Sequence, residues 1–253
     1  MIKFFRKIRQ NLLSEGKTGK YLKYALGEIV LVVFGILIAL SLNNWNQNVT
    51  YKNELVQTVK EIRSDLNRDI LFLREEINFS EAFINNVENL LNNGNKMPVD
   101  SLLNNISRVH SVSSLTTINF GYNKLNKHPK SELLPDSLTN NLTTYYSTFS
   151  VESNNLYYEG LSLYSLNLLR DYLIEHGFPL ELTELERPKD ISNFNYIIND
   201  IEFIGILRNT KHNRSTQRRI VIEALKQAES NLCLLYTSPS PRDRTRSRMP
   251  SSA

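Results

Sequence analysis

The stretch ALGEIVLVVFGILIALSL, from Ala25 to Leu42, decides the fold of this chain. It carries a single charge, Glu28, and as a helix it would be ~27 Å long, close to the thickness of a bilayer core. Aromatic residues typical of membrane interfaces flank it on both sides: Tyr21, Tyr24 and Trp45. We therefore predict a transmembrane helix over residues 25–45, with the lipid bilayer as its partner.

The charge on the two sides of this stretch is unequal. Residues 1–24 hold seven basic residues and one acidic residue, a net charge of +6. The positive-inside rule therefore predicts a cytoplasmic N-terminus and an extracytoplasmic, periplasmic domain. Apolar residues recur every three or four positions among the cations, which predicts a basic amphipathic segment on the cytoplasmic side: Ile2, Phe5, Ile8 and Leu12.

Three small residues and one acid stand out inside the apolar stretch. Gly27, Gly35 and Ala39 would share one helical face, a candidate contact face for a homodimer in the membrane. Glu28 is a candidate functional residue because ionisable groups in membranes are costly, although snorkelling toward the headgroups is the simpler interpretation. A cleaved signal peptide is the alternative to an anchor, since Ala39-Leu40-Ser41 has the shape of a cleavage site.

The last 21 residues resemble translated sequencing-library adapter rather than natural protein. The resemblance lies in CLLYTSPSPRD at 233–243 and SRMPSSA at 247–253; a natural basic, Pro/Ser-rich tail is the alternative. Without this tail the net charge falls from +4 to +1, and the only cysteine, Cys233, is lost. Residues 43–232 then carry a net charge of −4, which argues against nucleic acid as a partner. We expect the natural protein to continue beyond residue 232.

The apolar stretch also carries a family resemblance. GEIVLVVFGILIALSLNNWNQ, from Gly27 to Gln47, with KTGKYLKYAL before it, resembles an uncharacterised family of Bacteroidota single-span membrane proteins with a domain of unknown function. Weaker similarity runs through 120–125, 142–146 and 200–209. The resemblance implies an inner-membrane protein with a helical extracytoplasmic domain, and it transfers no catalytic residue. Phe34 and Ser41 differ from the family's usual Ile and Gln.

The rest of the chain predicts an all-α fold, in which the transmembrane helix continues into an extracytoplasmic antiparallel helical bundle over 46–232. An apolar stripe from Leu55 to Leu91 predicts one helix running from the span to about Asn93. A parallel coiled-coil dimer through this stripe is the alternative, although Asp69 and Ser80 interrupt strict heptads.

Shorter helical segments follow the long one. We predict a short helix that Asp100 caps and that ends at His110, a connector with little regular structure over about 111–135, and a helix from 136 to Gly177. A last helix starts near Asn195.

The sequence contains few candidates for catalytic or metal-binding residues. The four histidines, His110, His128, His176 and His212, stand apart without metal-ligand spacing, so no metal or other cofactor is predicted. Two carboxylate pairs, Asp65-Asp69 and Glu75-Glu76, are expected on exposed helix faces. Five tyrosines at helical spacing could line a groove, although such residues usually pack with the hydroxyl reaching water: Tyr145, Tyr146, Tyr157, Tyr158 and Tyr164.

These observations favour a non-enzymatic, membrane-anchored helical module that contacts other envelope proteins, with a homodimer as one form. The alternative is a sensory domain that binds a small molecule near Tyr145 to Tyr164 and signals through a separate cytoplasmic partner. A buried acid/base pair in the bundle would make it an enzyme, which is the least favoured reading.

Overall fold

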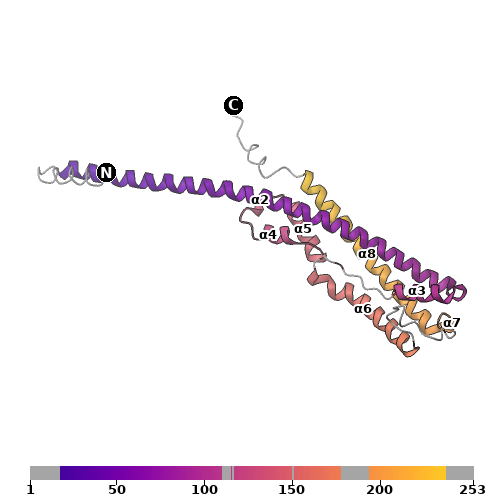
Figure 1. Ribbon diagram of the computed structural model, residues 1–253. Helices are drawn as coiled ribbons and strands as arrows, with labels where there is room; N and C mark the ends of the chain where they lie inside the picture. The colour runs from indigo at the N-terminus through magenta and orange to yellow at the C-terminus, as the bar shows by residue number, and fades with distance from the viewer. Residues whose placement is uncertain (1–17, 110–114, 116, 150, 178–193, 238–253) are drawn as a thin grey trace. The chain divides into compact units, whose positions relative to one another are not determined.

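The computed structural model describes residues 18–109, 115, 117–149, 151–177 and 194–237 (Figure 1). These residues form an all-α structure, and no strand occurs among them. The chain divides into two compact units, 1–54 and 55–253. The predicted fold class is therefore confirmed as all-α, and the predicted amphipathic segment at 1–24 lies mostly outside the described residues.

Helix α2 runs without a break from Thr18 to Asn93. It therefore begins before the predicted boundary at Ala25 and ends at Asn93, as predicted. The 3₁₀ helix η1 follows at Gly94–Lys96. Gly94 is buried there, and a Cβ at this position would come within 2.9 Å of the Ile198 side chain. A larger residue would displace Ile198 from the core, so glycine suits the turn.

In the first unit, α2 presents its apolar side chains to the outside on every face. The helix is long and apolar enough here to cross a membrane, and none of its most apolar 18-residue stretch is buried. In the second unit the same helix behaves differently, because Leu55, Ile62, Leu66 and Leu73 are fully buried. The stripe is thus covered within the chain, which leaves it no role as the seam of a coiled-coil dimer.

The segment after α2 has more regular structure than predicted. Helix α3 spans Val99–Val109, so Asp100 lies in its first turn. The predicted connector contains helix α4, Phe120–Asn126, and the 3₁₀ helix η2, Ser131–Leu133. The prediction of an irregular connector was wrong because α4 is stabilised by tertiary contacts of Gly121 and Leu125, which local sequence does not reveal.

The remaining helices complete the bundle. Helix α5 spans Asp136–Phe149, and α6 spans Val151–Glu175; the predicted single helix 136–177 is described as these two elements, with Ser150 outside the described residues. Gly177, at a φ of 72°, follows the end of α6, as expected for a C-terminal glycine. The short α7, Phe194–Ile197, precedes α8, Ile201–Thr237.

Helices α2 and α8 are antiparallel within the second unit, as predicted. Three ion pairs show this, because the residue number increases along α2 as it decreases along α8: Arg74–Glu229 at 2.7 Å, Glu81–Arg218 at 3.2 Å and Glu88–Lys211 at 2.6 Å. Helices α5 and α6 also pack against α8, since Asn141 contacts Asn231 and Ser165 contacts Asn213.

The core between these helices consists of two apolar clusters. One joins α2 at 55–73 with α4, α5 and the second half of α8, and the other joins α2 at 83–90 with α3, α6 and the first half of α8. Helix α8 continues past 232, and Leu235 is buried. The origin of residues 233–253 stays a prediction, and 238–253 lie outside the described residues.

Candidate functional site: a buried carboxylate clasp

Five polar residues of α2, Thr58 among them, lie on its buried face rather than on the exposed one. Asp65 and Asp69 are only 2% and 1% exposed, and Glu76 and Ser80 are buried as well. The expectation that Asp65-Asp69 and Glu75-Glu76 are solvated was therefore wrong, except for Glu75, which is exposed. Each of them lies three or four positions from an apolar residue of the stripe, so they face the core with it.

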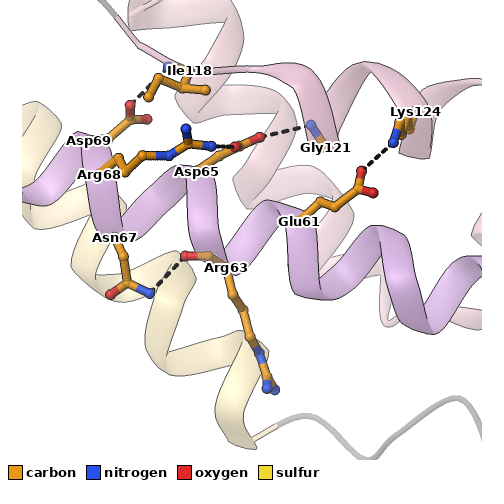
Figure 2. A network of polar contacts seen from close by, with 9 residues as sticks. All are labelled: Glu61, Arg63, Asp65, Asn67, Arg68, Asp69, Ile118, Gly121 and Lys124. Carbon is orange, nitrogen blue, oxygen red and sulfur yellow. Dashed lines mark hydrogen bonds and ion pairs between the residues drawn. The ribbon is translucent and has the colours of Figure 1, made fainter.

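Asp65 holds the start of helix α4 against α2. Its Oδ2 accepts a hydrogen bond from the backbone N–H of Gly121 at 2.8 Å, and its Oδ1 accepts one from the Arg68 guanidinium at 2.7 Å (Figure 2). The Arg68 side chain is largely exposed, so it neutralises Asp65 from the solvent side. Nearby, Lys124 of α4 forms an ion pair with Glu61 at 2.6 Å.

Gly121 is required by the closeness of this contact. A Cβ at position 121 would lie 2.6 Å from the backbone nitrogen of Ile62 and 2.8 Å from its side chain. Backbone cannot yield as a flexible side chain can, so a larger residue would separate α4 from α2. Gly121 and Asp65 thus fix one point of close approach between two helices.

Asp69 lies one turn further along α2 and holds two other elements. Its Oδ1 accepts a hydrogen bond from the Ile118 N–H at 2.8 Å, and its Oδ2 accepts one from the Tyr145 hydroxyl at 2.9 Å. Ile118 precedes α4 and Tyr145 is on α5. Burial raises the pKa of Asp69 from 3.8 to about 6, although the two hydrogen bonds oppose this effect. We call Asp65, Asp69, Ile118, Gly121 and Tyr145 the carboxylate clasp.

The tyrosines beside the clasp form a packed aromatic group. The Tyr145 and Tyr146 rings meet edge to face at 4.9 Å, and Tyr146 stacks on Tyr122 of α4 at 4.6 Å. Both Tyr145 and Tyr146 are buried, and burial together with the Asp69 charge raises the pKa of each phenol. The expectation that these hydroxyls reach water is wrong for Tyr145, which donates to Asp69.

A second buried polar group lies further along the bundle. The Arg214 guanidinium of α8 is 3.6 Å from Glu76 and lies over the Phe83 ring at 4.4 Å. The Ser80 hydroxyl donates to Glu76, and Asn213 donates to Ser165 of α6 at 2.8 Å. Sequence reasoning singled out neither Arg214 nor Asn213, because their partners are far away along the chain.

The five tyrosines considered as a groove lie in different surroundings where the structure describes their side chains. Tyr145 and Tyr146 are buried in the core, whereas Tyr164 is 60% exposed on α6. The side chains of Tyr157 and Tyr158 lie outside the described residues. A shallow cleft of about 260 Å³ between α5 and α8 is lined by polar residues instead, among them Asn141 and Gln227.

The candidate residues of the apolar stretch lie in the first unit. Gly27, Gly35 and Ala39 are exposed, and no other side chain lies within 4 Å of a Cβ built at either glycine. This arrangement leaves a face available for a second copy, and the contact itself stays a prediction. Glu28 is partly exposed and takes part in an interaction within the chain.

The described histidines are scattered: His212 is exposed on α8, His176 follows the end of α6, and His128 lies between α4 and η2. His110 lies outside the described residues. Within the described ranges, no group of three or more His, Cys, Asp or Glu side chains could hold a metal ion. Both carboxylates of the clasp are enclosed by the protein.

The protein is thus all-α, and one helix in its described part is long and apolar enough to cross a membrane. Residues 28–156 match the family described as "Family of unknown function (DUF6090)". The match covers just over half of the chain, so the chain belongs to this family. It includes most of the apolar stretch and every residue of the carboxylate clasp. Neither a curated protein nor a solved structure matches the chain.

Proposed function

We propose that this protein is a single-span, membrane-anchored helical module of the bacterial inner membrane, with a cytoplasmic N-terminus and a periplasmic domain that binds other envelope proteins without catalysis. The observation that carries the proposal is the exposed apolar surface of α2 between Leu26 and Leu42. Soluble proteins rarely expose so large a continuous apolar surface, and a lipid bilayer would cover it. The net charge of +6 on residues 1–24 supports the proposed orientation.

Fusion of a reporter after Leu232 tests the orientation. An alkaline phosphatase fusion should be active and a green fluorescent protein fusion dark, because the first folds only outside the cytoplasm and the second only inside. The reverse pattern would reject a periplasmic domain. N-terminal sequencing of the membrane-extracted protein separates an anchor from a signal peptide, since a mature chain that starts at Leu42 would contradict the anchor.

An exposed apolar surface on α6 supports protein binding. Leu163, Tyr164 and Leu168 are 49%, 60% and 36% exposed on neighbouring turns, although α6 is otherwise part of the bundle. Burial of such side chains against a partner would contribute binding free energy that solvent exposure forgoes. This surface is the place at which we expect an envelope partner to bind.

Site-specific photocrosslinking in native membranes tests this expectation. A crosslinker in place of Tyr164 should capture the same envelope protein repeatedly, whereas one in place of Arg208, an exposed residue of α8, should not. Replacement of Leu168 with Glu should abolish capture at Tyr164. If both positions capture the same proteins, the α6 surface is not a binding site.

A homodimer through Gly27, Gly35 and Ala39 is part of the proposal. Replacement of Gly35 with Leu should reduce association in a membrane two-hybrid assay, because close approach of two helices needs a small residue. Ile36→Leu, which changes the next position along the helix, is the matched control and should leave association unchanged. An equal signal from wild type and Gly35→Leu would reject this face.

A further inference from the structure

Asp69 differs from the other buried acids of the described bundle in the kind of donors that hold it. Asp65 is 2.7 Å from Arg68, and Glu76 is 3.6 Å from Arg214, so each has a cation beside it. The hydrogen bonds to Asp69 come from a peptide N–H and a phenol, both uncharged. A buried carboxylate that only neutral dipoles satisfy changes its protonation more readily than one in contact with a cation.

The two donors to Asp69 belong to elements that are otherwise separate in sequence. Ile118 lies 49 residues after Asp69, just before α4, and Tyr145 lies 76 residues after it, on α5. One carboxylate therefore ties both the approach to α4 and the helix α5 to α2. A change in its charge acts on both contacts at once.

The charged and titratable groups around Asp69 are few. On its own helix these are Asp65, whose charge disfavours a second anion, and Arg68, whose charge favours it. Helix α5 contributes the phenols of Tyr145 and Tyr146. The residues of α8 that enter the same core cluster in its middle turns are apolar: Val221, Ala224 and Ala228.

We propose that Asp69 is a proton-operated latch: when its carboxylate takes up a proton from solvent, the hold of α2 on Ile118 and Tyr145 loosens while the bundle stays folded. The protonated carboxyl gains an O–H donor and keeps one good acceptor oxygen. Ile118 N–H and the Tyr145 hydroxyl are both donors, so one of them loses a charge-assisted bond or, at Tyr145, the hydroxyl must turn around to accept. The proton adds to a carboxylate oxygen, and no other bond is broken.

The pKa of Asp69 determines the pH range in which the latch responds. Burial raises the pKa of Asp69 to about 6, so the latch responds between neutral and mildly acidic pH. Asp65, one turn away, keeps its hydrogen bond to Gly121 N–H and its contact with Arg68. We therefore expect Ile118 and α5 to move relative to α2, while the contact between Gly121 and Asp65 stays in place.

A distance measurement by spin labelling tests the latch in the full chain in detergent. The pair Asn67→Cys on α2 and Ser147→Cys on α5 uses exposed positions, in a Cys233→Ser background. Between about pH 7.5 and about pH 5, the mean distance should shift by on the order of 1–2 Å or the distribution should broaden. The midpoint of the change should lie near pH 6.

Two comparisons make the outcome decisive. Asp69→Asn imitates the neutral carboxyl, so its distribution should resemble that of the wild type at low pH and should not change with pH. A second pair, Asn85→Cys on α2 and Arg219→Cys on α8, should stay constant, because the bundle does not open. An unchanged wild-type distribution, an equal shift in Asp69→Asn, or a shift of the control pair would each overturn the latch.

Discussion

The two parts of α2 are the same helix by backbone geometry and opposite by environment. Between Leu26 and Leu42 its apolar side chains are exposed, and from Leu55 to Leu90 its apolar stripe is buried by the rest of the second unit. The first part is apolar on every face and contains no polar residue that needs a partner apart from Glu28 and Ser41. The second is apolar on one face only and places Asp65 and Asp69 within that face. Along one continuous helix, the distribution of apolar residues around the circumference therefore decides whether a part is exposed or packs against other helices.

The largest expected effect comes from a charge in the first part. Ile36→Lys places an ammonium group in the middle of the apolar stretch, which costs about 3 kcal/mol for insertion of a helix into a membrane. We expect most of the protein to be lost from the carbonate-resistant membrane fraction. Asn44→Lys, just beyond the stretch, is the control and should leave the protein in membranes. Full retention of Ile36→Lys would mean that this stretch is not the anchor.

In the second part, close packing at Gly121 gives the next largest effect. Gly121→Ala places a methyl group against the Ile62 backbone and should lower the free energy of unfolding by about 1–3 kcal/mol. Gly205→Ala on α8 is the matched control, because a Cβ there meets no atom within 4 Å. That control should raise the stability by about 0.5–1 kcal/mol through helix propensity. Denaturant unfolding measures both, and equal effects would contradict the close approach.

The buried charge of Asp69 predicts an effect that depends on pH. Because its folded-state pKa is raised from 3.8 to about 6, the folded protein binds the proton more readily than the unfolded chain does. The charged form of Asp69 therefore lowers the free energy of global unfolding above pH 6, even though it holds Ile118 and Tyr145 more tightly within the folded bundle, and this global cost disappears as the pH falls to about 4. Asp69→Asn should be more stable than wild type at neutral pH by about 1–3 kcal/mol, and this difference should shrink toward zero at about pH 4.

Glu75→Gln is the control for this experiment, since Glu75 is an exposed carboxylate on the same helix. Its difference from wild type should stay within about 0.5 kcal/mol at every pH. Thermal or denaturant unfolding at several pH values measures both variants. A constant difference between Asp69→Asn and wild type would show that the carboxylate does not change its protonation on folding in this range.

The smallest effect is expected at the surface of the second part. The ion pair between Arg74 and Glu229 has a short distance of 2.7 Å, but both side chains are about half exposed. Such pairs contribute about 0–1 kcal/mol because water and salt screen them. Arg74→Gln should therefore change the unfolding free energy by less than about 1 kcal/mol, and less at high salt. A larger loss would mean that this pair fixes the position of α8.

The sequence was sufficient for features that depend on neighbours along the chain. The apolar stripe predicted α2 and its end near Asn93, and Gly177 marked the end of α6. The site could not be predicted in this way. Gly121, the partner of Asp65, lies 56 residues away, and only the fold brings the two together. The one local signal was present: Asp69 and Ser80 occupy positions of the apolar stripe, which places them inside the bundle, yet they read as interruptions of a heptad.

The contact between Gly121 and the Ile62 backbone also constrains how the family can diverge. The acid at 65 draws the backbone at 121 so close that a side chain no longer fits, and both positions lie within the family match. Relatives that keep an acid at the first position should therefore keep glycine at the second, and those that lose the acid should be free to vary at both. The two sites should be inherited as a pair, a pattern that an alignment of relatives would reveal.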